Sequence, residues 1–384
     1  MELGPGKRNR DDIQSIPAAS LWDISIQFIG SRLLIWIVAG ASLLVVRKGQ
    51  FYVAQASPLE WFKRWDARSF LEIAAHGYAG TQGAKPNFPF LPLYPILVGF
   101  ASLGGAINLA LAGQLVSLAG LWCACILLWK TVMAEIHDER VAILSVSFLL
   151  FSPVSFFYSS PYSESLFLAL SIGCLHYMRG GRWWLAGFLG ALAALTRFIG
   201  IMLVVPMAWE AIGSFRNGRT ASARRLRALL ASLMPVLGFL GYCIFLRVYY
   251  GDFLLYFHVE QRFWGRQFAW FWLFLSHESF SNLPAFYQIL FGGALIGAFA
   301  LLVAGVLLRI PRAFTVYGLA LLSVYISSRL AEALPRYISV VFPLYIVTAI
   351  LAAKWPRAAM PLIAMSAALE AVFVVLFVNG YWFT

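Results

Sequence analysis

Ionisable side chains are concentrated in residues 64–78, RWDARSFLEIAAHGY, although most of this chain is apolar. The segment carries Arg64, Asp66, Arg68, Glu72 and His76. A carboxylate or guanidinium at membrane depth costs several kcal/mol, so we expect a helix at the membrane surface rather than one that crosses it. A positioned carboxylate such as Asp66 can take a proton from a hydroxyl group. The residues alone leave a second interpretation open, in which Asp66 pairs with Lys63 or Arg68 on a solvated helix face.

The composition indicates the class of protein that must position these side chains. Of the 384 residues, 61% are hydrophobic and 12% are charged, whereas roughly 25% of the residues of a soluble domain are charged. We therefore expect an all-α, polytopic membrane protein that forms a single domain over residues 1–384. The four cysteines lie in apolar spans and lack metal-ligand spacing, so we interpret them as small core residues.

Eleven membrane spans are predicted from apolar segments long enough to cross about 30 Å of hydrocarbon. Eight of them are clear from the sequence, at 24–46, 107–130, 140–158, 226–249, 286–308, 313–330, 335–353 and 358–382. The region 162–215 contains a span at 163–178, a basic turn, and a mostly apolar run that is interrupted by Arg197. Because a single helix through that run would bury the charge, we expect two short spans that meet at Arg197.

Basic residues are distributed over the predicted loops as the positive-inside rule requires. With the tail 1–22 and the basic cluster at 216–227 in the cytoplasm, the two long loops, 47–106 and 250–285, lie on the opposite side. The first span is expected to act as an uncleaved anchor. Nothing resembles a nucleic-acid-binding stripe, so we interpret the basic excess as a topology and anionic-lipid signal.

The first outer loop is predicted to contain two amphipathic helices. Ser57 and Glu60 form a capping-box pattern with Pro58 at the first helical position, so a helix should begin there and end near Gly77. Residues 87–105 contain three prolines in their first half, and they predict a turn followed by a half-immersed helix. The apolar surface of that helix could hold a lipid chain or serve as a simple anchor, and the sequence leaves both open.

Six segments, taken together and in order, resemble the PIG-V family of mannosyltransferases, which are GT-C type glycosyltransferases. They are residues 64–78, FPFLPLYP at 88–95, FSPVSFFYSSPYSESLF at 151–167, LTRFIGI at 195–201, FHVEQRFWGRQFAWF at 257–271 and LPRYISVVFPLY at 334–345. The resemblance implies a GT-C fold and transfer of mannose from a polyprenyl-phosphate sugar to a hydroxyl group on the non-cytoplasmic face. Compact loops and a phenylalanine after Arg197 fit the bacterial branch better, so we expect a bacterial plasma membrane and leave the acceptor open.

The resemblance also implies roles for individual residues. Asp66 falls where GT-C enzymes place a catalytic carboxylate, and it is the expected general base. The departing phosphate should meet Arg197, Arg336 or Arg329, although the last two could instead snorkel from helix ends. Glu164 caps its helix, orients the acceptor or holds a divalent cation, and no HxxH or DxD pattern supports such a cation. The remaining substrate-binding candidates are Trp65, Arg64, His76, Tyr162 and Tyr337.

The second outer loop adds aromatic and imidazole side chains. Trp264, Trp270 and Trp272 could stack on a sugar or a prenyl chain, but an interfacial aromatic belt explains them equally well. His258 and His277 could bind sugar hydroxyls, as could His76, and ordinary hydrogen bonding accounts for all three.

Two other classes of function remain compatible with the sequence, a transporter or flippase for lipid-linked sugars and a scaffold subunit of a glycosylation complex. Charge concentrated on the outer face rather than at the midplane favours the enzyme, as does the lack of an internal repeat. The expected partners are a polyprenyl-phosphate sugar donor, a glycolipid or glycan acceptor and membrane lipids, with no nucleic acid. The sequence does not distinguish mannose from a similar hexose.

Overall fold

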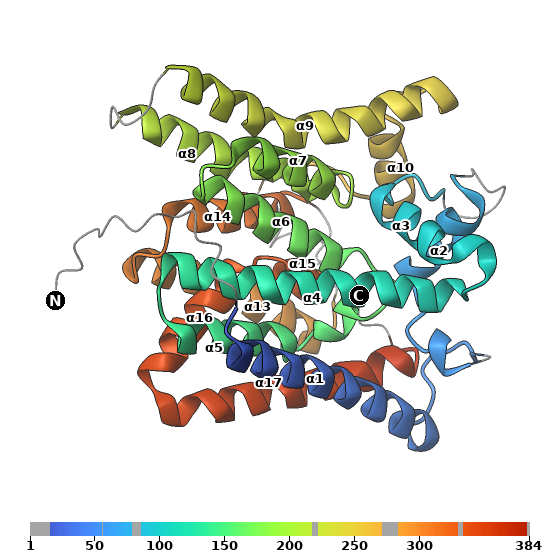
Figure 1. Cartoon of the computed structure of the whole chain (residues 1–384). Coiled ribbons are helices and arrows are strands. Elements are labelled where there is room, and N and C mark those ends of the chain that lie inside the picture. The colour runs from blue at the N-terminus through green and yellow to red at the C-terminus, as the bar shows by residue number, and fades with distance from the viewer. Residues whose placement is uncertain are drawn as a thin grey trace.

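The computed structural model describes residues 16–55, 57–78, 86–216, 222–270, 283–328 and 333–381. Within these ranges the backbone forms helices and one isolated bridge between Phe268 and Ser328 (Figure 1). The α-helices are α1 (Ala18–Val45), α2 (Asp66–His76), α3 (Leu93–Ala101), α4 (Leu109–Glu135), α5 (Glu139–Leu150), α6 (Glu164–Arg179), α7 (Trp183–Ala194), α8 (Val204–Arg216), α9 (Ser222–Tyr250), α10 (Leu255–Trp264), α13 (Ala285–Leu307), α14 (Arg312–Ile326), α15 (Leu334–Ser339), α16 (Pro343–Lys354) and α17 (Pro356–Val378). Short 3₁₀ helices are η1 (Pro58–Glu60), η2 (Leu103–Gly105), η3 (Ser155–Tyr158) and η4 (Phe198–Leu203).

The predicted multi-pass helical fold is confirmed. Helices α1, α4, α9, α13 and α17 are long and apolar enough to cross a membrane, and α7, η4 with α8, α14 and α16 are shorter apolar helices. Each of the eleven predicted spans contains at least one helix. The interruption expected at Arg197 is present, because α7 ends at Ala194 and Arg197 has the extended backbone angles φ −147° and ψ 139°.

Two predicted spans are broken, and the prediction of continuous helices there was wrong. The span 140–158 stops at Leu150 and resumes as η3, and the span 335–353 is divided into α15 and α16. Proline explains both breaks, since Pro153 and Pro343 lack the N–H that a continuing helix needs.

Buried Arg32 of α1 compensates for the break after α5. Its Nη2 donates to the Leu150 carbonyl at 2.7 Å and its Nη1 donates to the Ser155 carbonyl at 3.0 Å. Backbone carbonyls that a broken helix exposes at membrane depth need such partners. The guanidinium therefore holds the segment that leads from α5 to α6.

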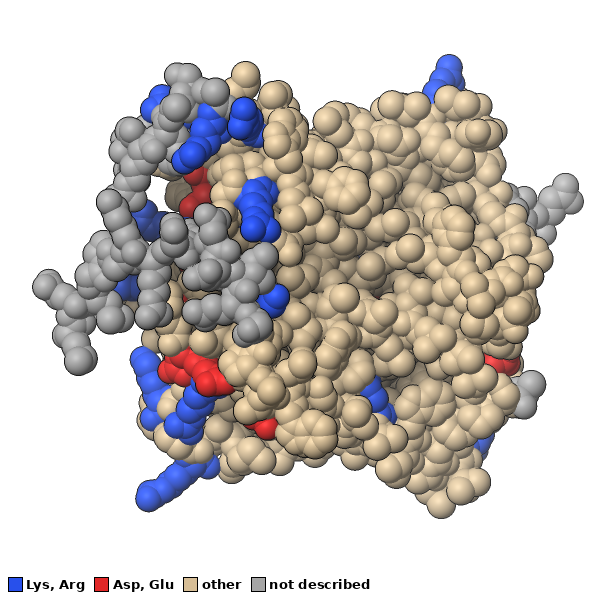
Figure 2. Space-filling view, viewed as in Figure 1, with Lys and Arg blue, Asp and Glu red and all other residues tan. Residues whose placement is uncertain are grey.

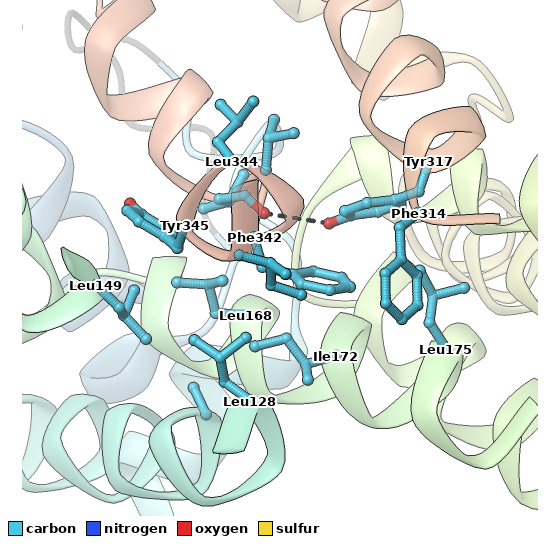
Figure 3. Close-up of a cluster of buried hydrophobic side chains, with 14 of the residues drawn as sticks. Leu128, Leu149, Leu168, Ile172, Leu175, Phe314, Tyr317, Phe342, Leu344 and Tyr345 are labelled. Carbon is cyan, nitrogen blue, oxygen red and sulfur yellow. Dashed lines mark hydrogen bonds between the residues drawn. The ribbon is translucent and has the colours of Figure 1, made fainter. Parts of the chain in front are cut away.

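Small residues and large side chains pack the helices together. A Cβ at Gly187 of α7 would lie 2.6 Å from the Ala231 carbonyl oxygen of α9, and small residues are typical of such close helix crossings in membranes. Figure 3 shows the central core, where side chains from α4, α5, α6, α14 and the α15–α16 region meet. Tyr317 donates to the Val340 carbonyl at 3.2 Å within this core.

The first outer loop differs from its prediction at one end. The capping-box pattern forms only the short η1, Ser57 makes no capping hydrogen bond, and α2 begins at Asp66. The predicted end is confirmed at Gly77, whose φ of 76° favours glycine. Phe70 of α2 is buried inside the protein, because α2 packs against α3 and α4.

The predicted helix in 87–105 is confirmed as α3. Ile96 and Phe100 on α3 are exposed, as an apolar surface towards lipid would be.

Helices α2, α3 and α10 lie together at one end of the bundle (Figure 1). In the same view, the visible lysine and arginine side chains gather mainly at the opposite end (Figure 2). This asymmetry agrees with the positive-inside pattern of the sequence. The end that carries α2, α3 and α10 is called the α2 end below.

Candidate functional site

A cavity of about 980 Å³ lies at the α2 end of the bundle. Its walls come from α2, the segment before α3, η4, α10, the end of α14 and α15. These elements are separated along the chain and are joined locally, for example by the hydrogen bond from the Ala269 N–H to the Ser327 carbonyl at 2.8 Å. The cavity is large enough for a drug-sized ligand.

Four charged side chains form a chain at the cavity, and three of them line it. Arg336 Nη2 lies 2.8 Å from Asp66 Oδ2, and Arg336 Nε lies 3.4 Å from Glu164 Oε1. Glu164 Oε1 in turn lies 2.5 Å from Arg197 Nη1. The structure thus brings together four of the residues that sequence analysis named as site candidates, from α2, α6, the α7–η4 connection and α15.

Helix termini position the two carboxylates. Asp66 is the first residue of α2 and Glu164 is the first residue of α6, where the helix dipole favours a negative charge. The residue before Asp66 is strained, because Trp65 has φ 45° and ψ −120°. Strain of this kind persists where surrounding contacts enforce it and is common at functional sites. The Trp65 ring is held by Phe377 of α17, with ring centroids 4.9 Å apart.

The two carboxylates differ in access to the cavity. The side chain of Asp66 is 32% exposed and lines the cavity, whereas that of Glu164 is 1% exposed. Glu164 Oε1 lies between the two arginines, below the surface of the cavity wall. Asp66 is therefore the carboxylate that a bound substrate could reach.

Arginine side chains surround one aromatic ring at the site. The guanidinium carbons of Arg197, Arg266 and Arg336 lie 5.4, 5.4 and 5.1 Å from the ring centroid of Tyr337. Such cation–π contacts help to hold like charges close together. Nε and Nη1 of Arg336 make no hydrogen bond to any described residue. Both nitrogens are buried, Nε on the side of Glu164, and Arg336 as a residue lines the cavity.

The other predicted residues are distributed around this centre. Trp65 and Tyr337 line the cavity. Tyr162 is buried beneath Arg336, 5.3 Å from its guanidinium, and donates to the Arg64 carbonyl at 2.9 Å. Arg64 is not part of the cavity wall, because its Nη2 donates to the Val378 carbonyl at 2.6 Å.

Two predicted residues fall elsewhere. His76 is exposed at the end of α2, away from the cavity wall. Arg329 lies outside the described residues. Their proposed roles in substrate binding stay predictions.

The structure also decides between interpretations that the sequence left open. Asp66 pairs with Arg336 rather than Lys63, whose ammonium lies 3.6 Å from Glu60. Glu164 begins a helix and also bridges two arginines, while its expected roles towards the acceptor or a cation stay predictions. Within the described part of the chain, no group of three metal-ligating side chains could hold a cation.

Sequence analysis missed two charged residues of the site, Glu260 and Arg266. Glu260 Oε2 lies 3.5 Å from Arg266 Nε, and Arg266 donates to the Tyr337 hydroxyl. Both residues line the cavity. The segment FHVEQRFWGRQFAWF contained the signal, since it places Glu260 and Arg266 on either side of a glycine suited to end a helix.

The remaining aromatic and histidine candidates of the second outer loop are divided. Trp264 lines the cavity, while Trp270 is exposed and outside its wall. His258 lies 2.7 Å from Asp252 in an exposed pair. Trp272 and His277 lie outside the described residues.

Comparison with known proteins places the chain in a family. It is 32% identical over 148 residues to a GPI alpha-1,6-mannosyltransferase 2 from Mus musculus, which covers 36% of this chain and 29% of that protein. It is 25% identical over 252 residues to a GPI mannosyltransferase 2 from Schizosaccharomyces pombe, covering 59% and 51%. The chain thus spans about half or less of these relatives.

A solved structure confirms the GT-C-like fold. ArnT from Cupriavidus metallidurans, bound to undecaprenyl phosphate, superposes with a TM-score of 0.58 at 18% identity, covering 94% of this chain and 70% of ArnT. The family model described as Mannosyltransferase (PIG-V) matches residues 46–271, which is more than half of the chain. This protein therefore belongs to the PIG-V mannosyltransferase family.

Proposed function

We propose that this protein is an inverting glycosyltransferase that moves mannose, or a similar hexose, from a polyprenyl-phosphate sugar to a hydroxyl group of a lipid-linked or glycan acceptor. The observation that carries the proposal is the Asp66–Arg336 pair in the cavity wall, with Arg336 tied through Glu164 to Arg197. A carboxylate that a substrate can reach and guanidinium groups in the wall of the same cavity are what such a transfer needs.

Asp66 acts as the general base in this proposal. As the acceptor oxygen attacks the anomeric carbon, its proton passes to the Asp66 carboxylate. The bond between the anomeric carbon and the phosphate oxygen breaks on the opposite face of the sugar, and its electron pair leaves with the phosphate. A phosphate leaves as a stable anion, so a second carboxylic acid is not obligatory, in contrast to glycosidases.

Arg336 and Arg197 receive the departing phosphate. Negative charge grows on its oxygens in the transition state, and fixed cations stabilise it without reorganisation. Guanidinium groups suit this task because they donate two parallel hydrogen bonds to two oxygens. Arg336 also holds Asp66 at 2.8 Å, so one residue couples the base to the leaving group.

The comparisons support the choice of substrates. The named relatives are mannosyltransferases, and the ArnT structure contains undecaprenyl phosphate. The basic end of the bundle opposite the cavity supports a site on the non-cytoplasmic face of the membrane. We expect that membrane to be a bacterial plasma membrane, as the compact loops suggest.

The test is sugar transfer by the purified protein from a panel of polyprenyl-phosphate sugars, followed by release of polyprenyl phosphate. Asp66→Asn keeps the shape of the side chain but removes the base, so transfer should fall about 100-fold to 10,000-fold while donor binding persists. Glu72→Gln, an exposed change on the same helix, is the control and should transfer at the wild-type rate. Transfer by Asp66→Asn at the wild-type rate would refute the assignment, and a flippase would respond to neither change.

A further inference from the structure

The part of the cavity wall formed by α10 has a chemistry different from that around Arg336. Glu260, Gln261 and Trp264 of this helix all line the cavity. Between them they offer a carboxylate, an amide and an indole ring. None of the three has a part in the transfer step described above.

Glu260 is the unusual member of this group. The residue is 8% exposed, and its Oε2 accepts no hydrogen bond from any described residue. Its nearest cation is Arg266, at 3.5 Å, which is too long for a good hydrogen bond. A buried carboxylate oxygen with an unused lone pair is costly unless a ligand supplies the missing donor.

The local fold fixes the position of the Glu260 side chain. Gly265 ends α10 in the left-handed conformation, with φ 65°, and the Arg266 N–H donates to the Glu260 carbonyl at 3.2 Å. This cap holds Arg266 beside Glu260, and the hydrogen bond from Arg266 to the Tyr337 hydroxyl fixes the other end of the arginine. Glu260 therefore lines the cavity in a position that the helix cap and Arg266 hold fixed.

Aromatic rings flank the same wall. Trp264 packs edge to face with Phe90, with ring centroids 6.1 Å apart, and both line the cavity. An aromatic face offers apolar contact to the C–H surface of a ring, while a carboxylate and an amide pair with its hydroxyls. A phosphate would be repelled by Glu260, and an isolated amine would find Arg266 beside it.

We propose that Glu260, Gln261 and Trp264 form a subsite for a pyranose ring, with Glu260 accepting hydrogen bonds from ring hydroxyls and Trp264 covering one face. The inference rests on the proposed function and adds the position of a sugar. Glu260 lines the same cavity as Asp66, the proposed base. The ring in this subsite is therefore one of the two reacting sugars, in the donor or in the acceptor.

The experiment uses the full chain and separates the two sources of the ring. Glu260→Gln and Trp264→Leu should raise the KM of one sugar substrate about 10-fold to 100-fold, the loss expected when a hydrogen bond to a charged group or an aromatic contact is removed. A rise in donor KM assigns the donor ring, and a rise in acceptor KM assigns the acceptor ring. Affinity for polyprenyl phosphate without sugar should stay at the wild-type value. Trp270→Leu, in the same loop but outside the cavity wall, is the matched control.

A binding measurement distinguishes failure of this inference from failure of the proposed function. Methyl mannoside and methyl glucoside are tested by saturation-transfer NMR against the wild type and Glu260→Gln. If no transfer occurs but a glycoside binds the wild type and not Glu260→Gln, the subsite stands and the transferase proposal falls. The subsite is refuted if both KM values stay unchanged in Glu260→Gln and Trp264→Leu. It is also refuted if Trp270→Leu matches Trp264→Leu, or if polyprenyl phosphate affinity falls as much as sugar affinity.

Discussion

The two ends of α6 carry arginine–carboxylate clusters that differ in how completely they are paired. Glu164, at the first residue of the helix, joins Arg197 and Arg336 beside the cavity. Arg179, at the last residue and about 22 Å away along the axis, joins Glu135 and Glu210. The helix dipole favours a negative charge at the first residue and a positive charge at the last, as Glu164 and Arg179 provide.

The cluster of Arg179 is saturated. Its Nε and Nη2 donate to the two oxygens of Glu135 at 3.0 and 2.7 Å, and its Nη1 donates to Glu210 at 2.7 Å. Arg336, in contrast, leaves Nε and Nη1 without a hydrogen bond to a described residue and lines the cavity. We therefore expect identical chemical groups to act as a structural clamp at one end and as a receptor for an oxyanion at the other.

The first prediction compares the carboxylates of the two clusters and has the largest expected effect. Glu164→Ala removes the buried carboxylate between Arg197, 15% exposed, and buried Arg336, and should lower the free energy of unfolding by about 3 kcal/mol. Glu135→Ala should cost less, because Arg179 is 21% exposed and keeps Glu210. Transfer per folded molecule should fall at least about 100-fold in Glu164→Ala and stay near the wild-type rate in Glu135→Ala.

Thermal unfolding and the transfer rate of the folded fraction check this prediction, with Glu164→Gln as the variant that keeps side-chain shape. Equal loss of transfer in Glu135→Ala and Glu164→Gln would contradict the claim that only the cluster of Glu164 takes part in transfer.

The second prediction uses pH to sharpen the description of the cavity. Burial raises the pKa of Glu260, and the positive charge of Arg266 partly offsets this rise. The negative charge of Asp66 raises the pKa of Glu260 further. Tyr256 and Tyr337 are the other titratable groups in this region. If the ionised carboxylate binds a sugar hydroxyl, sugar affinity falls as pH drops through that raised pKa. The midpoint should lie above about 4.3, the value of an unperturbed glutamate.

Sugar affinity measured against pH checks this expectation in the wild type and Glu260→Gln. The glutamine amide does not titrate. The curve of sugar affinity against pH for Glu260→Gln should therefore lack the midpoint that lies above the pKa of an ordinary glutamate. Identical profiles in the two proteins would contradict the role of the carboxylate.

The third prediction concerns an exposed pair and has the smallest expected effect. Lys63 and Glu60 lie 3.6 Å apart, with side chains 36% and 21% exposed. Lys63→Ala should lower the free energy of unfolding by less than about 1 kcal/mol and leave transfer unchanged. Denaturant unfolding with a parallel transfer assay measures both, and a clear loss of transfer would mean that η1 takes part in the site.

The sequence predicted those parts of the site that leave a local signal. Arg197 interrupts an apolar run, so a break was expected there and is present. Glu164 begins a helix after a turn, and Asp66 stands in a charged segment within an apolar chain. In each case the cost of a charge in hydrocarbon restricts the possible structures.

Long-range contacts determine what the sequence did not predict. The capping-box pattern at Ser57 failed because Arg64 binds the Val378 carbonyl and Phe62 packs on Trp36 and Phe377, which fixes the chain before α2 in another path. The role of Arg266 depends on Tyr337, 71 residues later. Tertiary contacts of this kind override local preferences.

The most direct test of the difference between the two ends is the affinity for polyprenyl phosphate, measured in nanodiscs for Arg336→Ala, Arg336→Lys and Arg179→Ala. We predict that Arg336→Ala weakens binding at least about 10-fold, as expected when a hydrogen-bonded charge is removed. Arg336→Lys should rescue part of the loss because it restores the charge but not the planar fork. Arg179→Ala should bind as the wild type does. Wild-type affinity in Arg336→Ala, or an equal loss in Arg179→Ala, would contradict the assignment of the phosphate to the cavity.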